Sequence, residues 1–145
     1  MKLTRASSYA IHAVAFMAAQ KLEKPVASHK IAADRGIPER FLLKVLKPLV
    51  SARVLRSIKG PNGGYQLARP ASDISMLEIL EAVDGPIRGQ APFDAKSNAS
   101  LNTKLEEICN HSAEVVRKSL DKIRVSELVG AKPEPASRRR AASSR

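Results

Sequence analysis

A stretch in the middle of the chain, SIKGPNGGYQLARP at positions 57–70, constrains the fold more than any other part of the sequence. Glycines and prolines crowd its centre, and apolar residues flank them on both sides. Asn62-Gly63 is the strongest short hairpin signal, because both central residues of a type I′ turn need positive φ. A hairpin this short buries little by itself, so it must pack against another part of the molecule.

Helical patterns precede this hairpin. A first helix is expected from Thr4 to Leu22, with Thr4 as its N-cap. Its apolar run resembles a signal peptide, but His12 interrupts it and it is too short to span a bilayer, so we expect a core helix. A short second helix is expected to begin with Ser28 as its cap and to end at Gly36.

The third helix is expected to run from residue 38 to residue 52 and carries the clearest amphipathic pattern. Pro38 suits its first turn, whereas Pro48 predicts a kink or weak point inside it. Its apolar residues recur at helical spacing and are Phe41, Leu42, Val45, Leu46, Leu49 and Val50. The opposite face is polar and mostly cationic.

Two capping-box patterns follow the hairpin. Ser75 and Glu78 predict the start of a fourth helix, which Gly85 closes. Thr103 and Glu106 predict that a long helix begins there. The apolar residues of this long helix are Leu105, Ile108, Val115, Val116, Leu120 and Ile123. This stripe is most simply explained as a dimer interface.

The order helix, short helix, helix and hairpin predicts a winged helix-turn-helix with the hairpin as its wing. We expect a mainly α protein with a small β wing and a long C-terminal dimerisation helix. The expected parts are a DNA-binding domain at 1–85, a loop at 86–103, the dimerisation helix at 104–130 and a basic, disordered tail at 131–145. The wing is expected to lean on the third helix.

The charge of the chain favours a polyanionic partner. Lys and Arg number 25 against 14 Asp and Glu, a net charge of +11. Nucleic acid is the first candidate for such a partner and an anionic membrane surface the second, and we expect no membrane association. The single cysteine, Cys109, excludes a disulfide framework and indicates a reducing compartment, so a cytoplasmic location is expected.

The first turns of a recognition helix reach base edges in the major groove of double-stranded DNA. Arg40 could donate twice to a guanine, and Glu39 could accept from a cytosine amino group. Lys47 and Arg5 suit phosphates, and Lys59 suits the minor groove. The full set of expected DNA contacts is Arg5, Ser28, Pro38, Glu39, Arg40, Phe41, Lys44, Lys47, Lys59, Pro61, Gly63 and Gly64.

Some of these residues have a second interpretation. The charged face of the third helix could be an ordinary solvated surface. Leu43 either touches a thymine methyl or packs at the edge of the core, and Tyr65 is expected to pack against the core. A protein-interaction module that uses the same surfaces without specific DNA binding is the alternative function. An enzyme is not expected, because His12, His29 and His111 are scattered and form no nucleophile–base arrangement.

Several of these segments together resemble the Rrf2 family of winged-helix regulators, whose known members include an iron–sulfur cluster regulator. The resemblance rests on KLT…YA, IAADRGIPERFLLKVLKPL and LRSIKGPNGGYQLARP…ISMLEILEAVDGP, which cover residues 1–86. It implies a homodimer whose long helices cross, bound to an operator with inverted half-sites. It also implies that Arg40, Phe41 and Lys44 meet bases and that Lys59 enters the minor groove.

The sequence departs from the family pattern at two places. Cluster-binding members carry three cysteines in the loop before the long helix, whereas residues 86–103 contain none. Because an iron–sulfur cluster normally needs four ligands, no cluster, metal or other cofactor is expected. Cys109 is either a redox-sensing thiol or a small hydrophobe, and the effector, a small molecule or a protein, is left open. Arg53 replaces the usual glycine after the recognition helix, and because a left-handed backbone would cost roughly 1 kcal/mol there, the turn is expected to differ slightly.

Overall fold

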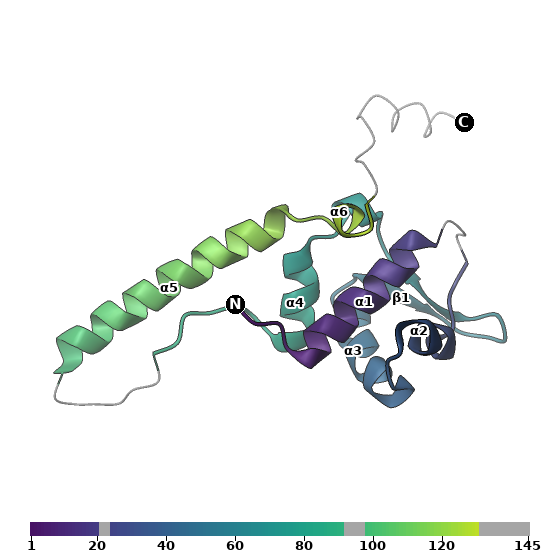
Figure 1. The fold of residues 1–145 in the computed structure, drawn as a ribbon, viewed down its shortest axis with the longest axis horizontal. Helices are drawn as coiled ribbons and strands as arrows, with labels where there is room; N and C mark the ends of the chain where they lie inside the picture. The colour runs from purple at the N-terminus through teal and green to yellow at the C-terminus, as the bar shows by residue number, and fades with distance from the viewer. Residues whose placement is uncertain (21–23, 92–97, 131–145) are drawn as a thin grey trace, which may run out of the picture.

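The computed structural model describes residues 1–20, 24–91 and 98–130. Helices α1 to α4 pack around one another, and α5 extends away from them (Figure 1). The elements in chain order are α1 (Arg5–Ala19), α2 (Ser28–Arg35), α3 (Glu39–Ser51), β1 (Leu55–Ile58), β2 (Gly64–Leu67), the 3₁₀ helix η1 (Ala71–Asp73), α4 (Met76–Asp84), α5 (Ala99–Lys122) and α6 (Val125–Leu128). The mainly helical fold with a small wing is therefore confirmed, while the expected tail at 131–145 lies outside the described residues.

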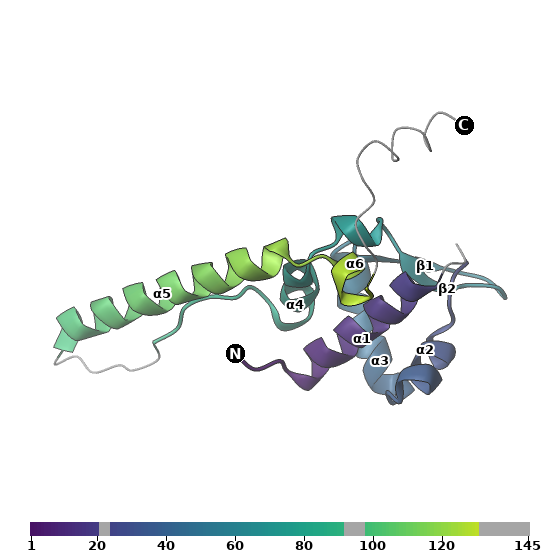
Figure 2. The same cartoon turned by 45° about the horizontal axis from the view of Figure 1, so that its top comes forward.

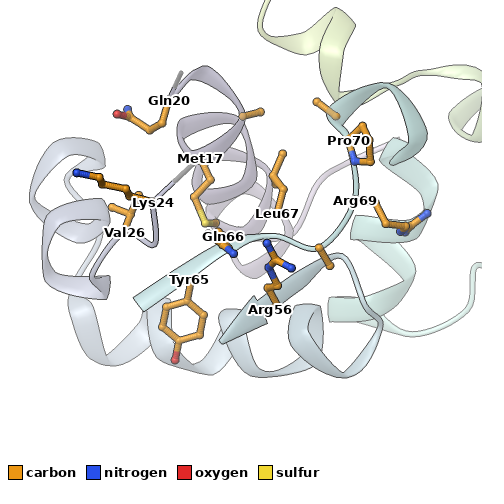
Figure 3. Close-up of a pocket in the computed structure, with 13 residues that line it drawn as sticks. Met17, Gln20, Lys24, Val26, Arg56, Tyr65, Gln66, Leu67, Arg69 and Pro70 are labelled. Carbon is orange, nitrogen blue, oxygen red and sulfur yellow. The ribbon is translucent and has the colours of Figure 1, made fainter. Parts of the chain in front are cut away.

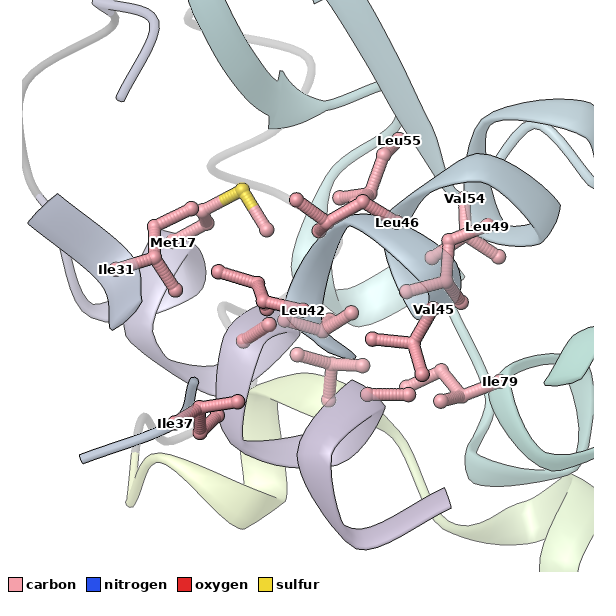
Figure 4. Close-up of a cluster of buried hydrophobic side chains, with 14 of the residues drawn as sticks. Met17, Ile31, Ile37, Leu42, Val45, Leu46, Leu49, Val54, Leu55 and Ile79 are labelled. Atoms are coloured by element: carbon pink, nitrogen blue, oxygen red, sulfur yellow. The ribbon is translucent and has the colours of Figure 1, made fainter. Parts of the chain in front are cut away.

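The buried core is aliphatic and centres on α3 (Figure 4). The apolar stripe predicted for α3 is buried at Leu42, Val45, Leu46 and Leu49. The buried residues of α1 are Ser7, Ala10, Ala13, Val14 and Met17, which confirms a core helix. The small side chains of Ala10 and Ala13 let α1 pack closely against α3. The expected kink at Pro48 does not divide the element, because α3 continues as one helix to Ser51.

The caps agree only in part with the sequence patterns. Thr4 caps α1, since its hydroxyl accepts from the Ser7 N–H at 3.0 Å, and Gly36 ends α2 with a φ of 64°. The helix stops at Ala19 rather than Leu22, because the backbone of Gln20 is already extended. The prediction that Ser28 caps α2 is wrong: Ala27 occupies the N-cap and no side chain caps that end.

The wing pairs β1 with β2 in antiparallel register from Leu55↔Leu67 to Ile58↔Gly64. The predicted two-residue type I′ turn is wrong, because five residues connect Ile58 to Gly64 and Asn62 does not have a positive φ. Instead, the Gly63 N–H donates to the Gly60 carbonyl at 3.0 Å. Pro61, at the second position of that turn, favours an ordinary turn over its mirror image because its ring sets a negative φ.

Two backbone hydrogen bonds attach the wing to the segment before α2. The N–H of Val26 donates to the carbonyl of Tyr65, and the N–H of Tyr65 donates to the carbonyl of Val26, each at 2.8 Å. β1 also packs against α3, as expected. The Tyr65 side chain packs against the core, which confirms its predicted role. The wing is thus held on two sides rather than by α3 alone.

The capping box at the start of α4 is confirmed. The Ser75 hydroxyl accepts from the Glu78 N–H at 3.2 Å, and the Glu78 carboxylate accepts from the Ser75 N–H at 2.8 Å. Burial raises the pKa of Glu78, but the Ser75 hydrogen bond and the pairing with Arg69 outweigh it and hold the pKa below its usual value. Gly85 closes the helix. The pairing of Arg69 with Glu78 joins the segment that follows β2 to α4.

The predicted start of the long helix at Thr103 is wrong. α5 begins at Ala99, and the Thr103 hydroxyl lies inside the helix, where it donates to the Ala99 carbonyl at 2.9 Å. A threonine hydroxyl can serve either as a cap or as a donor to the carbonyl four residues earlier, so the local pattern did not distinguish the two. The long helix also ends earlier than expected, at Lys122.

The chain then returns to the winged-helix core. The Met76 N–H donates to the Ile123 carbonyl at 2.8 Å, and the Val125 N–H donates to the Ile74 carbonyl at 2.9 Å. Val125, the first residue of α6, is fully buried in the same core as α1 and α3. Figure 2 shows α6 beside α1. The end of α5 is therefore tied directly to the core that α1 and α3 form.

Arg53 has a φ of 60°, so the turn keeps a left-handed residue although a change was expected there, and Arg53 is the only non-glycine residue with positive φ in the described parts of the chain. Arg53→Gly is expected to raise the free energy of unfolding by about 0.5–1 kcal/mol, because glycine adopts this conformation without a Cβ penalty. Urea unfolding checks the value. Ala52→Gly, at a φ of −82°, is the control and is expected to destabilise.

Candidate nucleic-acid interface

The solvent-exposed face of α3, opposite its buried stripe, is mostly polar. Glu39, Arg40, Lys44 and Lys47 are all exposed, and so is Pro38 at the N-cap. Phe41 is 39% exposed and Leu43 43% exposed, so two large apolar side chains of α3 are open to solvent. Leu43 therefore does not belong to the core. The structure thus brings all the predicted base-reading residues to one helix end.

Phe41 is the centre of a small cluster on this face. The guanidinium carbon of Arg40 lies 4.8 Å from the centroid of the Phe41 ring, and the Nζ of Lys44 lies 5.7 Å from it. Cations within about 6 Å of an aromatic centroid are attracted by the negative ring face. The spacing of apolar residues had placed Phe41 in the stripe opposite the cations, and this is wrong, because the ring is exposed and contacts both of them.

Ser28 and Glu39 come together at the junction of α2 and α3. The Ser28 hydroxyl donates to Oε1 of Glu39 at 2.9 Å. Sequence reasoning placed Ser28 among the expected DNA contacts and Glu39 among the base readers, and it did not foresee their hydrogen bond. The bond holds the Glu39 carboxylate toward α2 while leaving its second oxygen free to accept another donor.

A groove of about 610 Å³ separates the wing tip from the start of α2. Pro61, Asn62 and Gly63 line it on the wing side. The opposite side is formed by Lys24, Pro25, Ala27, His29 and Lys30. Lys24, His29 and Lys30 are exposed and were missed by the sequence reasoning, although two lysines flanking a short helix start are a visible signal.

The remaining predicted contacts lie outside α3 and outside the lining of this groove. Lys59 is exposed at the end of β1, in the loop of the wing. Arg5 is exposed in the first turn of α1, beside Thr4, whose hydroxyl donates to Asp84 at 2.8 Å and so joins α1 to α4. Gly64 is half-buried and serves the attachment of the wing, because any Cβ there would overlap the backbone of Val26.

A second hollow, of about 520 Å³, lies between α1 and β2 and contains none of the predicted contacts (Figure 3). Met17, Val26 and Leu67 contribute apolar surface to it, and Gln20 and Arg56 contribute polar groups. Both this hollow and the groove at the wing tip include Lys24. The wing therefore has an open surface on each side of its attachment to residue 26.

The apolar stripe of the long helix α5 is packed only toward its C-terminal end. There, Val116 and the C-cap residue Ile123 pack with the buried Leu120 against Leu77 and Leu80 of α4. The exposed apolar residues, nearer the start of the helix, are Leu101, Leu105, Ile108 and Val115, which we call the exposed stripe of α5. Their spacing places them along one side of the helix. The predicted stripe therefore divides into a packed part and an open part.

Two further properties bear on the kind of site. In the described ranges, no group of three or more His, Cys, Asp or Glu side chains could hold a metal ion, and Cys109 stands alone, half-buried on α5. Over the same ranges, no helix is long and apolar enough to cross a bilayer. The exposed surfaces of this structure are instead cationic on α3 and the wing and apolar on α5.

A short helix, a second helix with an exposed cationic face and a hairpin beside it define a winged helix-turn-helix protein. Residues 3–131 match the model of the Rrf2 family, described as "Iron-dependent Transcriptional regulator". The chain belongs to this family of transcriptional regulators, and the resemblance noted in the sequence is confirmed. The family and its members are regulators rather than enzymes.

Curated relatives are similar to much of this chain. The putative HTH-type transcriptional regulator Rv1287 of Mycobacterium tuberculosis is 33% identical over 106 residues, covering 68% of this chain and 66% of the relative. Protein aau3 of Rhizobium meliloti is 30% identical over 141 residues, covering 92% and 88%. The alignment thus spans just under two thirds of the mycobacterial relative and most of the rhizobial one.

Solved structures share the fold. CymR, described as the global cysteine regulator of Bacillus subtilis, has a TM-score of 0.73 at 22% identity, covering 92% of this chain and 99% of that one. An IscR from T. potens has a TM-score of 0.64 at 23% identity, covering 95% and 96%. At these identities the likeness establishes the fold alone, including the long C-terminal helix.

The family description implies iron, but the donor set of this chain does not fit an iron–sulfur cluster. Such clusters are held mainly by thiolates, normally four of them. Cys109 is the only cysteine in the whole sequence, and it lies on α5 rather than in the loop before it. The carboxylates and histidines of the described residues form no group around it that could replace the missing thiolates.

Proposed function

We propose that this chain is a homodimeric regulator of transcription that binds double-stranded DNA at an operator with inverted half-sites, without an iron–sulfur cluster. α3 would enter the major groove, and the wing over 56–67 would reach the adjacent minor groove. The proposal depends mainly on the two faces of α3. One face is buried in the core, and the opposite face exposes Arg40, Lys44 and Lys47 beside the attached wing. The cytoplasm is the compartment where such a regulator would act.

The groove between the wing tip and α2 supports the same arrangement. A duplex in front of α3 would bring one backbone strand past the start of α2, where Lys24, His29 and Lys30 are exposed. Cations at this place would neutralise phosphates without reading sequence. Arg5, Lys47 and Ser28 are proposed as further phosphate contacts, while Arg40, Lys44 and Glu39 are proposed as base readers. The names of the relatives, which are HTH-type regulators, point the same way.

The exposed stripe of α5 supports the dimer. A monomer would leave these apolar side chains in water, and contiguous exposed apolar surface marks interaction sites. Two copies that cross at this stripe would bury it and place two copies of α3 on one face of a duplex. The pairing of inverted half-sites follows from the two-fold symmetry of such a dimer.

Binding to DNA fragments selected from a random duplex pool tests the proposal. Arg40→Ala is expected to lower the preference for selected over scrambled duplex by roughly 10–100-fold, because one bidentate base contact contributes about 1–3 kcal/mol. Lys47→Ala is expected to weaken binding to both duplexes alike and to reduce the slope of log K against log salt by about 0.9. Fluorescence anisotropy over a salt series measures both effects.

Equal losses on both duplexes for both variants would contradict the assigned roles. Weak, salt-insensitive binding by the unchanged protein, together with tight binding to another protein, would instead favour the interaction module. Anaerobic purification provides a separate check on the cofactor. A colourless protein agrees with the proposal, whereas visible absorption bands of a cluster would overturn that part of it.

A further inference from the structure

The contacts of Phe41 differ from what helix geometry alone would produce. Lys44 is three residues after Phe41, so the two side chains lie on the same face of α3. Arg40 is only one residue before Phe41, and adjacent residues on a helix do not face each other. The guanidinium of Arg40 nevertheless lies 4.8 Å from the ring centroid, closer than the Lys44 ammonium at 5.7 Å. The Arg40 side chain therefore turns across the helix surface to reach the ring.

Both cations remain available to another partner. Neither Arg40 nor Lys44 forms an ion pair or hydrogen bond within the described parts of the chain, and both side chains are exposed. Arg69 and Arg117, by contrast, are paired with carboxylates. An arginine held over an aromatic face keeps its N–H donors at the rim of the guanidinium, where they can still bind a base edge in a bidentate manner.

The backbone that carries the ring is fixed. Leu42, the next residue, is fully buried, and α3 is held by a continuous buried stripe. Phe41 has only two side-chain torsions, whereas exposed arginine and lysine side chains each lose substantial rotamer freedom when they are ordered. A ring on a rigid helix that attracts both cations restricts that freedom before DNA arrives.

We propose that Phe41 is a positioning residue for sequence recognition: its ring holds Arg40 and Lys44 in the orientation in which they meet base edges, and these contacts persist in the complex. The inference rests on the proposed function and refines it, because Phe41 was expected to meet bases itself. In this arrangement Phe41 acts through the two cations. Phe41 therefore raises the affinity for the selected duplex relative to scrambled duplex, and it has little effect on binding to phosphates in general.

The DNA test uses Phe41→Leu, which keeps an apolar side chain but removes the ring face, and Phe41→Tyr, which keeps the ring. Phe41→Leu is expected to lower affinity for the selected duplex by about tenfold, as two exposed cation–π contacts allow, and to change affinity for scrambled duplex by less than about twofold. Phe41→Tyr is expected to retain the discrimination. The salt slope is expected to stay unchanged in both variants, since no phosphate contact is lost.

A double-mutant cycle separates positioning from direct contact. In a background with Arg40→Ala and Lys44→Ala, Phe41→Leu is expected to have almost no further effect on discrimination, because the residues that it positions are absent. An undiminished effect in that background would show that the ring touches a base directly, which overturns the proposal. Tighter binding by Phe41→Leu would also overturn it, because the ring would then be holding the cations away from DNA.

A measurement on the free protein keeps this inference separate from the proposed function. Protons of the Arg40 and Lys44 side chains near the ring are expected to resonate upfield in NMR spectra of the unchanged protein and to return to ordinary shifts in Phe41→Leu. Ordinary shifts in the unchanged protein would overturn the positioning role, whatever the DNA results. Upfield shifts without any preference for a selected duplex would support the cluster and contradict the proposed operator binding instead.

Discussion

Ile108→Glu is expected to convert the protein to a monomer and to weaken binding to the selected duplex at least about 100-fold. Ile108 is 61% exposed in the middle of the exposed stripe of α5, so a charge there does not disturb the fold of the subunit. In the proposed dimer the same charge would be buried, which is strongly unfavourable without a partner. In a dimer, binding of the first subunit holds the second subunit close to its own half-site, so the second binding step is nearly intramolecular. A monomer loses this gain in affinity.

Sedimentation velocity gives the oligomeric state, circular dichroism checks the fold, and anisotropy gives the affinity. Leu128→Glu is the matched control, because it adds the same charge at an apolar residue of 41% exposure on α6, outside the stripe. A variant at Ile108 that remains dimeric and binds normally would show that this stripe does not join the two copies.

Gly64→Ala is expected to detach the wing from the segment before α2. A Cβ at Gly64 would overlap the Val26 carbonyl and lie 2.8 Å from the Ala27 nitrogen, and backbone atoms cannot move aside as a flexible side chain can. We expect a loss of stability of roughly 1–3 kcal/mol. If the wing contributes one charge-assisted contact with DNA, affinity falls by roughly 10–100-fold as well.

Thermal unfolding and anisotropy measure the two effects, and hydrogen exchange at the Val26 and Tyr65 amides reports on the attachment directly. Gly60→Ala is the control on the same wing: Gly60 also has a positive φ, 108°, but a Cβ there meets open space. Unchanged protection of both amides in Gly64→Ala would mean that the wing tolerates the extra carbon.

Local patterns were sufficient for most of the fold. The apolar stripe of α3 predicted a helix with one buried face, and Gly36 and Gly85 marked helix ends because few other residues suit those conformations. The capping box of Ser75 and Glu78 was confirmed for the same reason, as it depends on residues three positions apart. Signals of this kind succeed because the interactions they report are made within one turn of the chain.

The errors arose where one local signal fits two structures. Thr103 suits a cap, but its hydroxyl bonds inside a longer helix. Asn62-Gly63 suits a mirror-image turn, but Pro61 favours the ordinary one. Ser28 suits a cap, yet it donates to Glu39, eleven positions away in the sequence. In each case the choice depends on residues or contacts that the short pattern does not include.

The sequence by itself determined the class of fold, the membership of a regulator family and the surface that carries the cations, since periodicity, turn residues and charge are local properties. Only the tertiary structure decided which side chains meet: Val26 with Tyr65, Val125 with the core, and Phe41 with its two cations. The first two join segments far apart in the chain. The third joins near neighbours, but it depends on side-chain torsions that residue spacing does not specify.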